Sequence, residues 1–237
     1  MIREHFAYRE TITTVLADSA EYIAAAKEAM LSARGILEEY IASDPFFKIS
    51  YEPVDVPASA PLIIRRMADA ATEAAVGPMA SVAASIAWAG AEAMQEEGAS
   101  FGLIDNGGDI AYFSDRALRV GIHAGCAPSS DKFAFVVPPG NSIRGICTSS
   151  ATVGPSVSFG ISDAVVCFSE NPAKADAWAT SLCNRITPEN FLAEMPAVSN
   201  LEGVYAVAGD WIGKWGKLPD IVPAKVDRNL ITKGYIE

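Results

Sequence analysis

Three short stretches of this sequence could bind a polar ligand, and the first is built around two consecutive glycines. Asp105 and Asn106 precede Gly107 and Gly108, and Asp109 follows them. Glycine adopts positive φ and has no Cβ to keep a ligand away from the backbone. Backbone N–H groups and flanking carboxylates suit a diphosphate held through a divalent cation, because the cation offsets the like charge. Asn-Gly between apolar runs is also typical of a hairpin turn, and a turn can form one wall of a site.

The second stretch, residues 145–160, is rich in serine, threonine and glycine. Thr148, Ser149 and Ser150 could supply hydroxyl and backbone N–H groups to a polar ligand. Cys147 precedes them, and hydrogen-bond donors around its thiol could lower the pKa of the thiol and make it catalytic. The alternative is a solvated loop that follows a buried strand cysteine.

The third stretch, residues 175–180, reads Ala-Asp-Ala-Trp-Ala-Thr. On a helix, Asp176 and Thr180 are four residues apart and project from one face. A carboxylate and a hydroxyl in that arrangement can share a hard cation such as Mg²⁺. The alternative is an exposed aspartate and a threonine that bonds its own helix backbone.

Hydrophobic periodicity predicts the elements that must position these stretches. Helices are expected at residues 19–41, 62–75, 78–97 and 172–185, with a further helical turn in 188–194. Partial alternation in the first sixteen residues predicts one or two strands, and residues 43–61 read as a loop. Short apolar runs predict further antiparallel strands at residues 101–105, 109–113, 118–124, 133–137, 143–148, 163–168, 204–208 and 211–215. Helices gather in the first half and strands in the second, which predicts the α+β class, with antiparallel sheets packed against helices.

Composition excludes several partners. Lys plus Arg is 18 and Asp plus Glu is 29 in 237 residues, a formal net charge of −11. Such a chain is unsuited to nucleic acid or to an anionic membrane surface. The apolar stretch 76–94 is broken by glycine, proline and serine, and the N-terminus lacks an apolar signal region, so we expect a cytoplasmic protein. The four cysteines form no CxxC pair and are expected to be free thiols, three of them in the core beside the candidate Cys147.

The order and spacing of the three stretches resemble the ApbE superfamily of FAD-dependent flavin transferases. In that family a Gly-Gly-Asp follows a long helix, a Ser/Thr-rich strand comes next, and an Ala-Asp-Ala-x-Ala-Thr helix holds Mg²⁺ on the diphosphate of FAD. The matching residues here are 107–109, 147–150 and 175–180. The resemblance implies FAD or FMN as ligand and Mg²⁺ bound by Asp176 and Thr180.

A smaller, poorly characterised ApbE-like family of anaerobic archaea and bacteria is similar over nearly the whole chain. The matching stretches are residues 9–13, 76–80, 105–109, 145–150 and 175–180. This resemblance implies one ApbE-like domain over residues 1–237, built from two T-fold-like halves around a shared cleft, with halves at 1–98 and 99–237. It also implies a cytoplasmic protein, and T-fold-like proteins often associate, so a homo-oligomer is expected.

Two positions depart from the transferase pattern. The family has a Lys-Gly pair before the long helix, where this chain has Val76-Gly77. Its His-x-Asp-Pro stretch is replaced here by Gly154-Pro155-Ser156. We therefore expect a ligand cleft with a cation site, formed by residues 105–109, 147–155 and 176–180, and do not expect transfer of FMN to a protein threonine.

Two other functions stay open. Cys147 could be the thiol carrier of a sulfur-handling protein, because a thiolate carries a persulfide, and the closer family resemblance implies a link to sulfide assimilation and homocysteine synthesis. A non-catalytic oligomeric interaction module is the second alternative. Its support is the expected helix 78–97, which is rich in small residues that could pack against another subunit.

Overall fold

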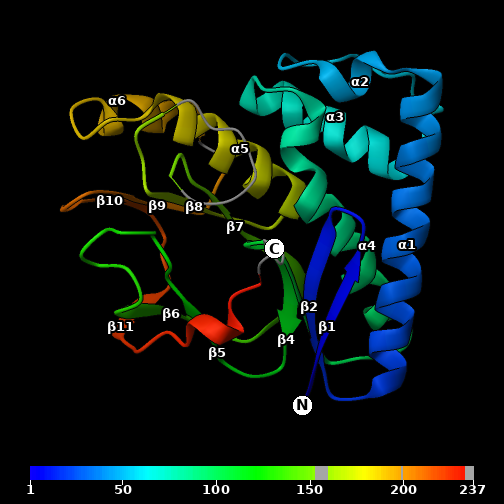
Figure 1. Ribbon diagram of the computed structural model, residues 1–237, viewed down its shortest axis with the longest axis horizontal. Coiled ribbons are helices and arrows are strands. Elements are labelled where there is room, and N and C mark those ends of the chain that lie inside the picture. Colours follow the sequence, from blue (N-terminus) through cyan, green and yellow to red (C-terminus); the bar gives the residue numbers. More distant parts are fainter. Residues whose placement is uncertain (153–159, 199, 233–237) are drawn as a thin grey trace.

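An antiparallel sheet of eight strands runs through the middle of the molecule in a computed structural model, which describes residues 1–152, 160–198 and 200–232 (Figure 1). The strand order is β1-β2-β3-β4-β7-β8-β9-β10. A second sheet has three strands in the order β11-β6-β5. The strands are β1 (Ile2–Tyr8), β2 (Thr11–Ala17), β3 (Phe101–Asn106), β4 (Asp109–Ser114), β5 (Leu118–Gly121), β6 (Phe133–Val137), β7 (Gly140–Ser149), β8 (Ala164–Ser169), β9 (Gly203–Ala208), β10 (Trp211–Gly216) and β11 (Asp220–Pro223).

The helices cover one face of the large sheet, and the three-stranded sheet lies on its other face (Figure 1). The helices are α1 (Ala20–Ser43), α2 (Phe46–Ile49), α3 (Leu62–Ala74), α4 (Val82–Glu96), α5 (Pro172–Arg185) and α6 (Phe191–Glu194). Short 3₁₀ turns span Pro78–Ser81, Met195–Val198 and Arg228–Leu230.

Alternate residues of each strand enter different cores, because successive side chains of a strand point to opposite faces. Ile104 and Ala111 pack with the helices, whereas their neighbours Leu103 and Ile110 pack toward the small sheet. This alternation places Asn106 and Asp109 on the helix side of the β3–β4 hairpin. It places Asp105 on the side of the small sheet.

Two units with the same element order form the large sheet. The first has strands β1 to β4 with α1 to α4 between β2 and β3, and the second has β7 to β10 with α5 and α6 between β8 and β9. The β4–β7 pair joins them, with Asp109 opposite Cys147. This order groups β3 and β4 with the first unit.

Most expected elements are present, and the α+β class with antiparallel sheets is confirmed. The expected strand 118–124 ends earlier, at Gly121, and the strand expected at 143–148 is longer, at Gly140–Ser149. The helix expected from residue 78 begins with the 3₁₀ turn, and the loop 43–61 contains α2. Strand β11 was not expected, because its four residues become a strand only by pairing with β6.

Small residues of α4 serve packing inside the fold. Ala84, Ala87 and Ala91 are buried, and a Cβ added at Gly90 would meet Ile104 at 2.5 Å and Met30 at 3.0 Å. The small face therefore lets α1 and β3 approach closely, so the small residues of this helix no longer support the interaction-module alternative. Among the described residues, no single helix has the length and hydrophobicity of a membrane span. The helix α3 and residues 78–96 have them only when taken together, and the two are bent by 105° relative to each other.

Candidate functional site

The Gly107–Gly108 turn borders open space. Asn106 pairs with Asp109 across the hairpin, so the two glycines are the turn residues, with φ of 72° and 108°. A Cβ added at either glycine would meet no atom of the described residues within 4 Å. The expected hairpin is confirmed, and the open side of the turn leaves room for a ligand.

Two carboxylates from different units of the fold meet on the helix side of this hairpin. Asp109 accepts a hydrogen bond from the backbone N–H of Thr148 at 3.2 Å. Asp176 accepts one from the backbone N–H of Ala84 at 3.0 Å. Burial and the nearby negative charge of Asp176 raise the pKa of Asp109 well above its ordinary value. Burial raises the pKa of Asp176 to about 7, and the bond from Ala84 opposes that rise.

Close approaches of three segments bring this pair together. A Cβ on Gly145 would lie 2.6 Å from Cα of Pro172, so only glycine lets β7 approach the start of α5 this closely. Asn171 caps α5 by accepting from the N–H of Lys174 at 3.0 Å. Asn106 donates from Nδ2 to the carbonyl of Ala83 at 2.9 Å, which ties the hairpin to the first turn of α4. The positive N-terminal end of α4 therefore lies at the carboxylate pair.

Cys147 lies beneath the pair and is fully buried. Its thiol donates to the carbonyl of Pro172 at 3.6 Å. Burial, followed by the charges of Asp109 and Asp176, raises the pKa of the Cys147 thiol well above its ordinary value. The expectation that neighbouring donors lower this pKa is wrong, because the nearest charges are negative. Cys126 is exposed, so the expectation that the three other cysteines all lie in the core is also wrong; Cys167 and Cys183 do.

The other candidates of the second and third stretches have different placements. Thr148 contributes its backbone N–H, while strand alternation turns its side chain to the other face. Ser149 is buried on the helix face, and Ser150 accepts from the N–H of Thr152 at 3.1 Å in a local turn. Thr180 is half-buried, one helical turn beyond Asp176. Residues 153–159, which include part of the expected cleft, lie outside the described residues.

Asp105 takes part in a separate set of contacts on the opposite face. Its Oδ1 accepts from the N–H of Gly108 at 2.8 Å, and its Oδ2 accepts from the hydroxyl of Thr232 at 2.6 Å. Burial raises the pKa of Asp105 against these two bonds. Asp105 therefore lies on the opposite face of the sheet from Asp109 and Asp176, although its charge also contributes to the raised pKa of Asp109.

Sequence reasoning missed two contributors. The N–H of Ala84 was overlooked, although Pro78 marked the start of a helix whose free N–H groups attract carboxylates. No pattern near Thr232 predicted its contacts, because its partners Asp105 and Thr14 are 127 and 218 residues away in sequence.

A divalent cation fits the pair when water or a ligand supplies its further oxygens. In the described ranges, no cluster of three or more His, Cys, Asp or Glu side chains could hold a metal ion alone. Magnesium commonly binds one or two carboxylates together with the phosphates of its substrate. The carboxylates of Asp109 and Asp176 suit that mode of binding.

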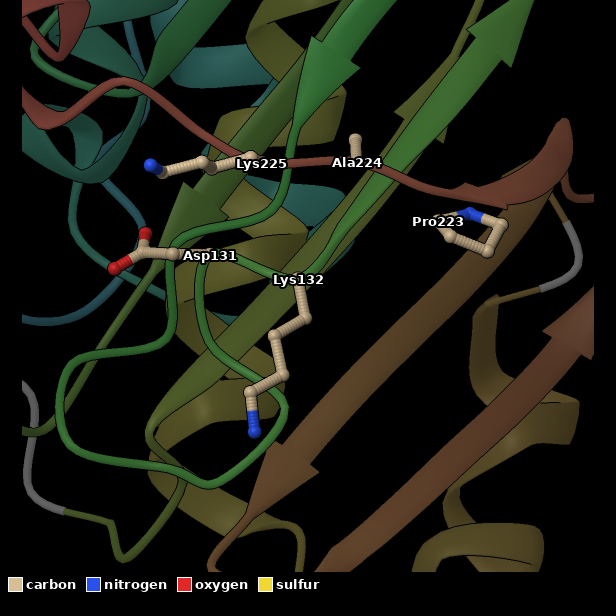
Figure 2. A pocket seen from close by; sticks show the side chains of 5 residues that line it. All are labelled: Asp131, Lys132, Pro223, Ala224 and Lys225. Carbon is tan, nitrogen blue, oxygen red and sulfur yellow. The ribbon is translucent and has the colours of Figure 1, made fainter.

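A shallow hollow elsewhere has no part in this arrangement. It has a volume of about 430 Å³ and lies where β6 begins and β11 ends (Figure 2). Figure 2 shows the side chains of Lys132 and Lys225 pointing in different directions. Its lining residues are Asp131, Lys132, Pro223, Ala224 and Lys225, none of them a candidate site residue.

Solved structures share this fold. A mutant of the flavin transferase ApbE from Vibrio cholerae has a TM-score of 0.59 at 12% identity, over 90% of this chain and 96% of that one. The apo flavinyl transferase ApbE of Pseudomonas stutzeri has a TM-score of 0.56 at 12% identity, over 99% and 98%. At this identity the likeness concerns the fold alone.

Sequence relatives lie much closer. A UPF0280 protein of Methanocorpusculum labreanum is 66% identical over 99% of this chain and 100% of its own length. One from Methanoregula boonei is 54% identical over 99% of each chain. A family model described as AbpE bacteria matches residues 3–202. The chain therefore belongs to this ApbE-like family, together with the UPF0280 proteins of archaea.

Proposed function

We propose that this protein binds a phosphorylated ligand of the flavin-nucleotide class, with Mg²⁺ held by Asp109 and Asp176. The observation that carries this proposal is the convergence of two buried carboxylates with raised pKa beside an open glycine turn. Like charges in one buried place cost free energy unless a proton or a cation offsets them. A bound Mg²⁺ would supply that charge and would bridge to the phosphates of the ligand.

The residues of the chain have separate roles in this proposal. Asp109 and Asp176 hold the cation, and Thr180 adds a neutral oxygen. The Gly107–Gly108 turn lets a diphosphate approach the backbone. The N-terminal end of α4, together with the cation, favours negative charge in a chain whose net charge is −11. Thr148 orients Asp109 through its N–H.

The fold supports the same location for the ligand. The two four-stranded units agree with the two T-fold-like halves that the family resemblance implies, and their joint is the β4–β7 pair. Asp109 comes from the first unit and Asp176 from the second. A site at the joint therefore needs both units in place.

The sulfur-carrier alternative has no support from the geometry. A carrier thiol must be accessible and easily ionised. The thiol of Cys147 is buried, and nearby carboxylates raise its pKa.

Calorimetric titration with FAD, with and without Mg²⁺, tests the proposal. We expect binding that depends on Mg²⁺ and is weakened at least about tenfold in Asp176→Asn and in Asp109→Asn, because each loses a charged cation ligand. Asp69→Asn is the matched control, since Asp69 is exposed on α3. Absence of FAD binding by the wild type, or equal binding by all three variants, would overturn it.

A further inference from the structure

The C-terminal segment forms a strap across the face of the large sheet opposite the carboxylate pair. Its first residues continue from β11 past the hollow of Figure 2, where Ala224 donates its N–H to the carbonyl of Lys132 at 2.8 Å. Val226 donates to the carbonyl of Asp131 at 3.1 Å. These bonds fix one end of the strap, residues 224–232, to the three-stranded sheet.

The other end of the strap is fixed to the first strands. The guanidinium of Arg3 donates to the carbonyl of Leu230 at 2.6 Å. Thr232 is 5% exposed, and its hydroxyl lies 2.8 Å from the hydroxyl of Thr14 and 2.6 Å from Oδ2 of Asp105. A hydroxyl has one proton, so Thr232 donates to Asp105 and accepts from Thr14.

Asp105 joins this strap to the candidate site. One of its oxygens accepts from Thr232, and the other accepts from the N–H of Gly108 at 2.8 Å. Gly108 is the turn residue with φ of 108°, and no described residue lies within 4 Å of a Cβ added there. The pairing of Asn106 with Asp109 across the hairpin and the hydrogen bond to Asp105 both restrain the conformation of Gly108.

We propose that Thr232 is a positioning residue, which holds Asp105 and through it the Gly107–Gly108 turn in the conformation that receives the ligand. The role in ligand binding rests on the proposed function; the restraint on the turn does not. The strap, residues 224–232, thus restrains the Gly107–Gly108 turn through the carboxylate of Asp105.

Amide hydrogen exchange measured by NMR tests the restraint without any ligand. In Thr232→Val, which keeps the shape of the side chain and removes the hydroxyl, the Gly108 amide should exchange about tenfold faster, as expected for loss of one restraining hydrogen bond. The amide of Ala111, in the β3–β4 ladder of the same hairpin, should be unchanged. Thr232→Ser restores the hydroxyl and should restore the slow exchange of Gly108. Thr187→Val is the matched control, because the hydroxyl of Thr187 bonds within its own loop, to Asn190 and Glu189, far from the Gly107–Gly108 turn in sequence.

FAD titration of the same variants with Mg²⁺ tests the consequence. Thr232→Val should bind several-fold more weakly than the wild type, and Thr232→Ser should bind equally well. Unchanged Gly108 exchange in Thr232→Val would overturn the proposal. So would faster exchange with unchanged FAD affinity, because Thr232 would then be structural alone. If the wild type binds no FAD, the proposed function fails, and the exchange rates alone decide whether the strap restrains the turn.

Discussion

Asp105 and Asp109 flank the same two glycines, yet they lie on opposite faces of the sheet in contrasting surroundings. Asp105 has two donors, a backbone N–H and the Thr232 hydroxyl, and belongs to a closed set of contacts. Asp109 has the N–H of Thr148 as a donor and faces a second buried carboxylate, Asp176. On one face of the hairpin, donors of the chain itself satisfy the carboxylate of Asp105. On the other face, the proposed cation would offset the charge of Asp109 and Asp176.

The largest expected effect is a difference in thiol reactivity between Cys147, beneath the carboxylate pair, and Cys126. Cys147 lies under the carboxylate pair and is buried, whereas Cys126 is exposed in the loop after β5. Under native conditions Cys126 should react with a maleimide at least about a hundredfold faster than Cys147, because reaction of Cys147 requires local opening and ionisation. Mass spectrometry of timed digests measures both rates. Equal rates would contradict a closed core beneath the pair and would revive the sulfur-carrier hypothesis.

The second expected effect is a dependence of the free energy of unfolding on pH, caused by the Asp109–Asp176 pair. The unfolded pKa of aspartate is about 3.9, and burial raises that of folded Asp176 to about 7. Between these values the folded chain holds protons that the unfolded chain releases, so this pair lowers stability as pH rises from about 4 to about 7, and its contribution is most favourable below about 4.

Asp109→Asn removes a buried carboxyl whose own pKa is raised by burial and by the charge of Asp176, so it should flatten that slope. Relative to the wild type, its free energy of unfolding should rise by on the order of 2 kcal/mol between acidic and neutral pH. Denaturant titration across the pH range measures this difference, in which groups shared by both proteins cancel. Asp69→Asn should follow the wild-type curve. A slope in Asp109→Asn as steep as in the wild type would show that the pKa of Asp109 is not raised in the folded protein.

Substitution of a turn glycine has a smaller effect. Gly108→Ala places a Cβ at φ of 108°, and the surrounding space is open, so its cost comes from the backbone alone. We expect a loss of about 1–2 kcal/mol in the free energy of unfolding. Gly35→Ala in α1 is the control and should gain about 0.5–1 kcal/mol, since alanine favours a helix. Equal effects of the two substitutions would mean that the turn adopts another conformation.

Local signals in the sequence predicted the elements well and the contacts between them only in part. The two glycines predicted the turn, and the spacing of Asp176 and Thr180 placed both on α5, because such patterns depend on neighbours along the chain. The face to which each aspartate points was not predictable without the strand register, since a shift of one residue reverses every side chain. The environment of Cys147 also depends on long-range packing. Its thiol was a candidate for reactivity from its neighbours in sequence, but packing buries it.

A Mg²⁺ titration without nucleotide, followed by calorimetry, tests the central claim most directly. Asp105→Asn and Asp109→Asn each remove one carboxylate, from opposite faces of the hairpin, and the wild type keeps both. We predict that the wild type and Asp105→Asn bind Mg²⁺ and that Asp109→Asn binds it at least about tenfold more weakly. Equal Mg²⁺ affinity in the two variants, or no Mg²⁺ binding by the wild type, would contradict a cation site at Asp109 and Asp176.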